Sequence, residues 1–213
     1  MQRPHGLAIL EVLIAFTIFL VVSILAVTAL VTASRYQRRL LDSQELETEC
    51  RAVMENITAD LFESFLRFVN VEPGSIVFPS PRDADQRLTV DPVDGSLLWS
   101  KFWCYYHEPS EKRLYKKFEI RPSGPQPEKS WMLLPPRDRA YFLLNGQTSR
   151  VLSESVEDFQ VTLLKPDPAT GPRALQAATR DDATLIELQL HLEVLSDSKP
   201  VGIKFTSKVV PRN

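Results

Sequence analysis

Glycine, histidine and cysteine are scarce in this chain, and their scarcity excludes several kinds of site. The 213 residues include only 7 Gly, 3 His and 2 Cys, against 16 Pro. So few glycines argue against a glycine-rich loop that cradles phosphate groups. A zinc site with four His or Cys ligands would use almost all of these residues, so we expect no metal centre of that kind.

An excess of charge of one sign is also missing. Lys and Arg total 25 against 27 for Asp and Glu, which gives a net charge of −2. Domains that bind nucleic acids through bulk charge are usually strongly basic, so this balance does not favour that function. Hydrophobic residues make up 44% and charged residues 24%, which is a globular composition and excludes wholesale disorder.

What the chain has in excess is an apolar run close to its N-terminus. From Leu7 to Thr32 the one charged residue is Glu11, and neither Pro nor Gly interrupts the run. As a helix the run would measure roughly 39 Å, which is enough to cross the hydrocarbon core of a bilayer. A secretory signal peptide is the alternative, with Val31-Thr-Ala33 as a cleavage site, but its apolar region usually has about 7–15 residues. We therefore expect a membrane-spanning helix over residues 7–33.

Glu11 is the residue that a plain membrane anchor does not explain. A carboxylate inside an apolar helix costs a few kcal/mol on insertion, and such groups usually have a partner. Glu11 is the fifth residue after Gly6, which closes a short polar segment at the start of the chain. The stretch Arg3-Pro-His-Gly6 followed by Leu7-Ala-Ile-Leu-Glu11 resembles the class III signal of type IV prepilins and pseudopilins.

This resemblance implies a role for each residue of the motif. Residues 1–6 would be a leader that prepilin peptidase removes, with Gly6 as its last residue. Leu7 would become the N-methylated terminus, and Glu11 would be the glutamate through which subunits assemble. The family prefers Phe, Thr and a basic residue at the positions that are held here by Leu7, Ala8 and His5.

The resemblance also implies where the chain resides. It predicts a single-pass protein of the bacterial inner membrane, with the leader in the cytoplasm and the bulk in the periplasm or otherwise outside the cytoplasm. A count of positive charges favours the opposite orientation, because Arg3 precedes the span whereas Arg35, Arg38 and Arg39 follow it. We take the orientation that the resemblance implies.

Beyond the apolar run, the pattern predicts an α+β fold. Over residues 34–70, apolar side chains recur at intervals of three to five, so we expect the helix to continue as an amphipathic segment to about Val69, before Pro73-Gly74. Residues 71–213 form a β-rich head, on which this half of the helix would pack, as in the pilin architecture. The expected strands are Ser75–Phe78, Arg87–Asp91, Leu97–His107, Arg113–Arg121, Ala140–Leu144, Val156–Leu164, Thr184–Ser196 and Gly202–Val210.

The order of the head segments carries a second resemblance. Trp103-Cys-Tyr-Tyr106, then a basic hairpin, then Val156–Val161 and Thr184–Leu190, looks like the large minor pseudopilins of type II secretion (the J-type component) and the large minor type IV pilins. This implies a structural minor subunit without enzymatic activity, cofactor or metal. Its partners would be other pilin or pseudopilin subunits, prepilin peptidase and the inner membrane. The sequence leaves open whether secretion, a pilus or DNA uptake is served.

The alternative is a membrane-anchored extracytoplasmic enzyme or ligand-binding domain in which Glu11 is incidental. His107 and His191 have no nearby Ser or Cys in a nucleophile context, so a catalytic triad is not supported. Three pairs of aspartates could bind Ca²⁺ but lack the spacing of a known calcium loop, and solvated turns explain them better. These pairs are Asp83 with Asp85, Asp91 with Asp94, and Asp181 with Asp182.

Two further features leave alternatives open. Cys50 lies on the apolar stripe of the helix and Cys104 in a central strand, so we expect them to pack together, either as two buried free thiols, which we favour, or as a disulfide. The basic run Lys112-Arg113 and Lys116-Lys117 could contact DNA phosphates. Acidic residues interleave with it, so a solvated hairpin end is the favoured interpretation and nucleic acid is not a favoured partner.

Overall fold

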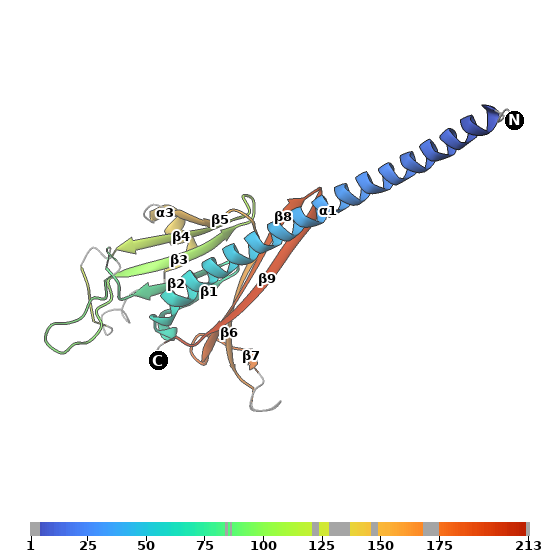
Figure 1. The fold of residues 1–213 in the computed structure, drawn as a ribbon. Coiled ribbons are helices and arrows are strands. Elements are labelled where there is room, and N and C mark those ends of the chain that lie inside the picture. Colours follow the sequence, from blue (N-terminus) through green and yellow to red (C-terminus); the bar gives the residue numbers. More distant parts are fainter. Residues whose placement is uncertain are drawn as a thin grey trace.

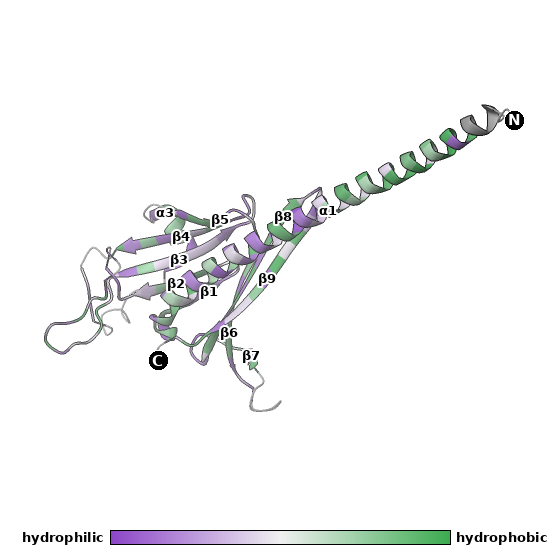
Figure 2. Cartoon of the chain, viewed as in Figure 1, coloured by the Kyte–Doolittle hydropathy of each residue, from purple (hydrophilic) through white to green (hydrophobic). Residues whose placement is uncertain are grey.

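The fold is α+β, as predicted, and is built on one long helix. The computed structural model describes residues 5–83, 85, 87–120, 124–127, 137–145, 149–167 and 175–211. Helix α1 (His5–Phe62) projects from the head over its N-terminal half and lies along the head over its C-terminal half (Figure 1). Hydropathy follows the same division, because the projecting half is almost continuously apolar and the other half is mixed (Figure 2).

The head consists of two antiparallel sheets. The first sheet has the order β1-β2-β3-β4-β5 and the second has the order β7-β6-β8-β9. The strands of the first sheet are β1 (Asn70–Glu72), β2 (Ser75–Ser80), β3 (Lys101–Glu108), β4 (Arg113–Ile120) and β5 (Arg150–Ser153). Those of the second are β6 (Val156–Pro166), β7 (Leu175–Ala177), β8 (Leu185–Ser196) and β9 (Lys199–Val209).

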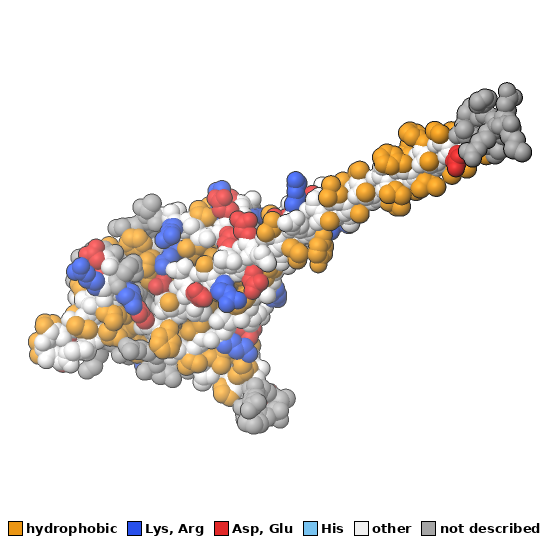
Figure 3. Space-filling view, in the orientation of Figure 1, with side chains coloured by type: hydrophobic (Ala, Val, Ile, Leu, Met, Phe, Trp, Pro, Cys, Tyr) orange, Lys and Arg blue, Asp and Glu red, His pale blue; other side chains and the backbone are white. Residues whose placement is uncertain are grey.

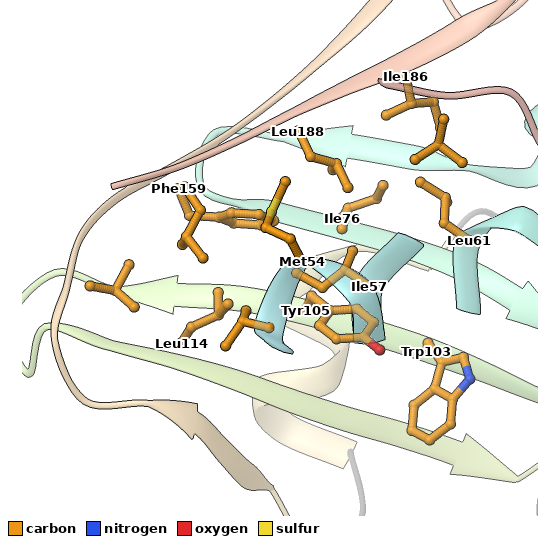
Figure 4. Packing of buried hydrophobic residues seen from close by; sticks show 14 of the residues in the cluster. Met54, Ile57, Leu61, Ile76, Trp103, Tyr105, Leu114, Phe159, Ile186 and Leu188 are labelled. Atoms are coloured by element: carbon orange, nitrogen blue, oxygen red, sulfur yellow. The ribbon is translucent and has the colours of Figure 1, made fainter. Parts of the chain in front are cut away.

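The main core forms where α1 lies between the two sheets (Figure 4). A stripe of the helix that recurs every three or four residues is buried: Leu46, Cys50, Val53, Met54, Ile57 and Leu61. It packs on Ile76, Tyr105 and Leu114 of the first sheet and on Phe159, Ile186 and Leu188 of the second. The strand expected over Thr184–Ser196 is confirmed as β8, and its residues alternate between the core and the outer face, with Ile186, Leu188, Leu190 and Leu192 buried.

A second, smaller core lies on the other face of the first sheet. It contains Val77, Trp99, Phe102, Cys104, Tyr106 and Phe142. Phe142 belongs to the short helix α3 (Arg139–Asn145). We predicted a strand over Ala140–Leu144, and this was wrong. The Asp138 side chain accepts a hydrogen bond from the Tyr141 N–H at 2.8 Å, which caps a helical turn and lets one face of it cover the sheet.

Other predicted boundaries also differ from the structure. Helix α1 ends at Phe62 rather than near Val69. The apolar spacing beyond it belongs to a short 3-10 turn (Leu66–Phe68), and Phe65, directly before the turn, and Phe68, its last residue, pack against the second core. The strand expected over Arg87–Asp91 is a loop with isolated bridges at Leu88 and Val90, and β3 begins at Lys101 rather than at Leu97. The short strands β1, β5 and β7 were not predicted, since three or four residues give little periodicity.

Candidate functional site

The projecting half of α1 is the most unusual surface of the molecule. Every large apolar side chain from Leu10 to Val31 is between 42% and 72% exposed. This is the one helix in the described part of the chain that is long and apolar enough to cross a membrane. Such a surface needs an apolar environment other than water, so the helix is compatible with a single-pass anchor or with a signal sequence.

The threonine hydroxyl groups along this segment are already hydrogen-bonded within the helix. Thr17, Thr28 and Thr32 donate hydrogen bonds to the carbonyls of Leu13, Ile24 and Thr28 at 2.7–2.8 Å. These bonds lower the cost of placing the polar groups in hydrocarbon. The charged side chain of this segment, the Glu11 carboxylate, has no such local bond among the described residues.

Glu11 is exposed, and hydrophobic side chains cover most of the projecting half of α1 around it (Figure 3). Among the residues that the structure describes, no cation lies within ion-pair distance of it. The backbone of Gly6 and Leu7 is helical, because α1 begins at His5, but the side chains of residues 5–9 and the whole of residues 1–4 lie outside the described part. The expected cleavage after Gly6 therefore stays a prediction.

A second charged site lies where the C-terminal end of α1 meets the first sheet, and we call it the junction (Asp60, Glu63, Arg82, Lys101, Trp103, Tyr105 and Lys116). Asp60 accepts hydrogen bonds from Lys116 Nζ, at 2.5 Å, and from the Tyr105 hydroxyl. Glu63 forms a bidentate pair with Arg82, with Nε to Oε2 at 2.6 Å. These cations lie near the negative end of the helix dipole, which adds to the attraction.

Lys101 is the most deeply buried cation of the junction. It is only 1% exposed, and its ammonium donates to the Asp83 carbonyl at 2.9 Å. Burial is the main cause that lowers the pKa of Lys101 to about 8; Asp60 opposes this shift, whereas the charge of Lys116 adds to it. The Lys101 and Lys116 ammonium groups lie 4.2 Å and 3.9 Å from the centre of the Trp103 ring, so the ring faces two cations.

The same environment fixes the protonation of Tyr105. Burial raises its pKa well above the usual value, and the neighbouring Asp60 carboxylate raises it further, so the hydroxyl remains a donor. The junction thus holds the C-terminal end of α1 to the first sheet through hydrogen bonds that are largely shielded from water. We did not predict it from the sequence; the available signal was a lysine, Lys101, at the start of an aromatic strand.

The cysteines do not pack against each other. Both are free and buried, but Cys50 belongs to the main core and Cys104 to the second core. Side chains alternate along β3, so Trp103 and Tyr105 point to the main core with α1 while Cys104 points to the opposite face. The expected packing of the two thiols was wrong, and the disulfide that we kept as an alternative is not formed.

This arrangement predicts the chemistry of both thiols. Burial raises the pKa of Cys50 to about 11 and that of Cys104 to about 12, so both should be unreactive in the native protein near neutral pH. In denaturant without reductant, we expect a thiol reagent to modify two groups per chain. A count of zero in denaturant would contradict the structure, and rapid modification of the native protein would contradict the burial.

The remaining candidate residues serve local structure. Asp83, Asp91 and Asp94 accept backbone N–H groups two residues along, and Asp182 pairs with Lys165. The basic residues of the hairpin all have local partners. Lys112 forms an ion pair with Glu157, and Lys116 forms one with Asp60. Arg113 pairs with Glu111 and Glu154, and Lys117 donates a hydrogen bond to the Phe142 carbonyl. His107 contacts the Val156 carbonyl at 3.0 Å, which links the two sheets, and His191 lies in β8. Among the described residues no three His, Cys, Asp or Glu side chains cluster as metal ligands.

Comparison with known proteins did not identify a relative of this chain. No protein-family model, curated protein or solved structure matches the chain. What stands is the architecture itself: a long apolar N-terminal helix whose second half packs on antiparallel sheets, which is pilin-like.

Proposed function

We propose that this chain is a structural minor subunit, a pseudopilin or a minor pilin, that assembles through its N-terminal helix into a filament or tip complex. The observation that carries the proposal is Glu11, a carboxylate on an exposed apolar helix that continues without a break into the packed head. An anchor for an enzyme needs the apolar helix but not the carboxylate, which makes insertion less favourable. A subunit that pairs this charge with a neighbour gains from it.

The partners follow from this function. In the membrane, the neighbours would be other pilin or pseudopilin subunits, whose apolar helices would pack beside α1. Prepilin peptidase would act earlier, at the bond between Gly6 and Leu7. The inner membrane would hold the apolar segment, and the head would lie in the periplasm.

The first test is the mature N-terminus. We expect removal of residues 1–6 and methylation of the new Leu7 amine, because Gly6 stands directly before the apolar segment. Intact-mass analysis of the membrane-extracted protein measures both. The matched control is Gly6→Val, which should stay uncut. A mature protein that starts after Ala33 would indicate a signal peptide, and a chain that keeps Met1 would contradict the processing; either result would refute the proposed function.

A further inference from the structure

Three arginines follow the apolar run of α1 directly, and we call the segment that holds them the collar (residues 35–41). Figure 3 shows basic side chains where the projecting helix meets the head. Arg35 and Arg38 are exposed and Arg39 is half-buried. Within the described residues these arginines form no ion pair, and the buried Arg39 Nε has no hydrogen-bond partner. The collar thus presents three positive charges to a partner outside the described part of the chain.

The arginines lie on the side of α1 that faces the head farther along the helix. Arg38 and Arg39 follow Arg35 by three and four residues, so the three share one helix face. Arg39 precedes Leu46 by seven residues, or about two turns, and Leu46 is the first member of the buried stripe. The arginine face therefore continues the buried stripe beyond the point where the head covers it.

The turn between β8 and β9 is the part of the head that lies closest to the collar (Figure 1). It carries one exposed charge of each sign, Asp197 and Lys199, and Leu195 beside it is 73% exposed. The turn therefore offers the arginines no net negative charge. Since their side of the helix is also the side of the head, the arginines face the space between the head and the surface of the membrane.

Charge changes sign along α1 directly after the collar. Residues 42–49 include four carboxylates and no basic residue, and the nearest of them, Asp42, is half-buried. Glu45 lies roughly 15 Å along the helix from Arg35, at about 1.5 Å per residue, which exceeds the Debye length of about 8 Å at physiological ionic strength. A negatively charged plane at the depth of Arg35 would therefore attract the collar and repel most of these carboxylates only weakly.

We propose that the collar binds the phosphate groups of anionic phospholipids in the leaflet beneath the head. The apolar run ends at Thr32, so the collar lies at the depth of the lipid headgroups when the run spans the bilayer. Guanidinium groups bind phosphate oxygens through paired N–H donors, and each basic residue at an anionic surface adds to the attraction. This contact fixes the depth of the helix and the height of the head above the membrane.

The inference rests on one part of the proposed function, which is that α1 stays in the membrane as an anchor. It does not depend on assembly with sister subunits. The full chain alone, reconstituted in a bilayer of defined composition, is therefore sufficient for the test.

Fluorescence quenching by spin-labelled lipids measures the lipid preference at the collar. Gln37→Cys places a fluorophore on an exposed position between the arginines, while the native cysteines stay buried and unlabelled. The protein is reconstituted in phosphatidylcholine nanodiscs that contain a small fraction of phosphatidylglycerol or phosphatidylcholine, spin-labelled on the acyl chain near the headgroup. We expect phosphatidylglycerol to be preferred roughly tenfold or more at low salt, and the preference to fall severalfold at high salt.

Substitution of the two exposed arginines tests the site. Arg35→Gln with Arg38→Gln should reduce the preference to about twofold or less, whereas Arg35→Lys with Arg38→Lys keeps the charges and should retain most of it. The matched control, Arg67→Gln with Arg180→Gln, removes two exposed positive charges far from the collar and should change nothing. Inorganic phosphate and chloride at equal ionic strength should weaken the preference equally, because the phosphate that is bound belongs to a lipid.

Each contrary result has its own meaning. Equal quenching by the two lipids in the wild-type chain would refute the inference and leave the proposed function intact. A preference that survives Arg35→Gln with Arg38→Gln, or that the control variant also loses, would show that the collar is not the site. Specific displacement by inorganic phosphate would assign the arginines to a free anion instead of a lipid. A membrane-extracted chain that begins after Ala33 would refute the anchor, and with it both the inference and the proposed function.

Discussion

We expect the Glu11→Gln variant of the proposed subunit to be inserted, cleaved and folded but unable to join its partners. After the proposed cleavage, Leu7 would carry a positive amine at the head of an apolar helix, and Glu11 lies one turn further on. Within one chain the helix holds the two charges in poor geometry for each other. We therefore expect the carboxylate to pair with the amine of a neighbouring subunit, which offsets the desolvation of both charges.

The size of the effect follows from the loss of one partner of a buried charge pair. Such a loss costs about 2–5 kcal/mol, which corresponds to a reduction of roughly 30-fold or more in the association constant. Co-purification of tagged sister subunits and complementation of the assembled machine measure it. Glu11→Asp is the matched control, because it keeps the charge with a shorter reach and should retain part of the assembly.

Two results would point elsewhere. Full assembly of the Glu11→Gln subunit would mean that electrostatic docking is not the mechanism in this protein. Loss of membrane insertion, instead of loss of assembly, would mean that Glu11 serves biogenesis. Intact mass and membrane fractionation of the variant distinguish these outcomes from the expected one.

The sequence predicted those parts of the fold in which one period dominates. The helical stripe from Leu46 to Leu61 and the alternation in β8 each have one buried face, so the pattern gives both the element and its orientation. In β3, residues from Phe102 to Tyr106 are apolar on both faces, so the pattern does not show which face meets α1. This ambiguity explains why Cys104 was assigned to the wrong core.

Of the two charged sites, one can be predicted from the sequence and the other cannot. Glu11 can be found from the sequence, because a lone charge in an apolar run has no local explanation. The junction cannot, since Asp60, Arg82, Lys101 and Lys116 come from four segments whose approach is set by the packing of α1 on the first sheet. In the sequence, Lys101 at the start of an aromatic strand is the one hint, and it does not show which residues approach it.

The two lysines on Trp103 should respond oppositely to the same substitution. Lys101→Met should stabilise the protein by about 2 kcal/mol near pH 7, because it removes a buried charge whose pKa is lowered to about 8. The loss of the hydrogen bond to the Asp83 carbonyl offsets part of the gain. Thermal or denaturant unfolding of the detergent-solubilised full chain, followed by tryptophan fluorescence, measures it.

Lys116→Met is the matched control, because it removes the ammonium group of the other lysine that lies over the Trp103 ring. Lys116 is the ion-pair partner of Asp60, at 2.5 Å, with the two side chains 16% and 14% exposed. The substitution leaves Asp60 in a poorly hydrated site with the Tyr105 hydroxyl as its remaining donor at the junction. We expect a loss of about 3 kcal/mol, since breaking a buried pair costs more than the pair contributes.

The pH dependence identifies the cause. The pKa of Lys101 is about 8 in the folded protein and 10.5 in the reference state, so between these values the unfolded chain binds more protons and the stability of the wild type rises with pH. The advantage of Lys101→Met over the wild type should therefore shrink by about 1 kcal/mol between pH 8 and pH 9. Tyr105 and the two thiols, whose pKa values are raised, act in the opposite direction at high pH, but they are common to both proteins and cancel in the comparison. If Lys101→Met destabilises the protein at every pH, its ammonium is a net structural contact, and the cost assigned here to its burial is wrong.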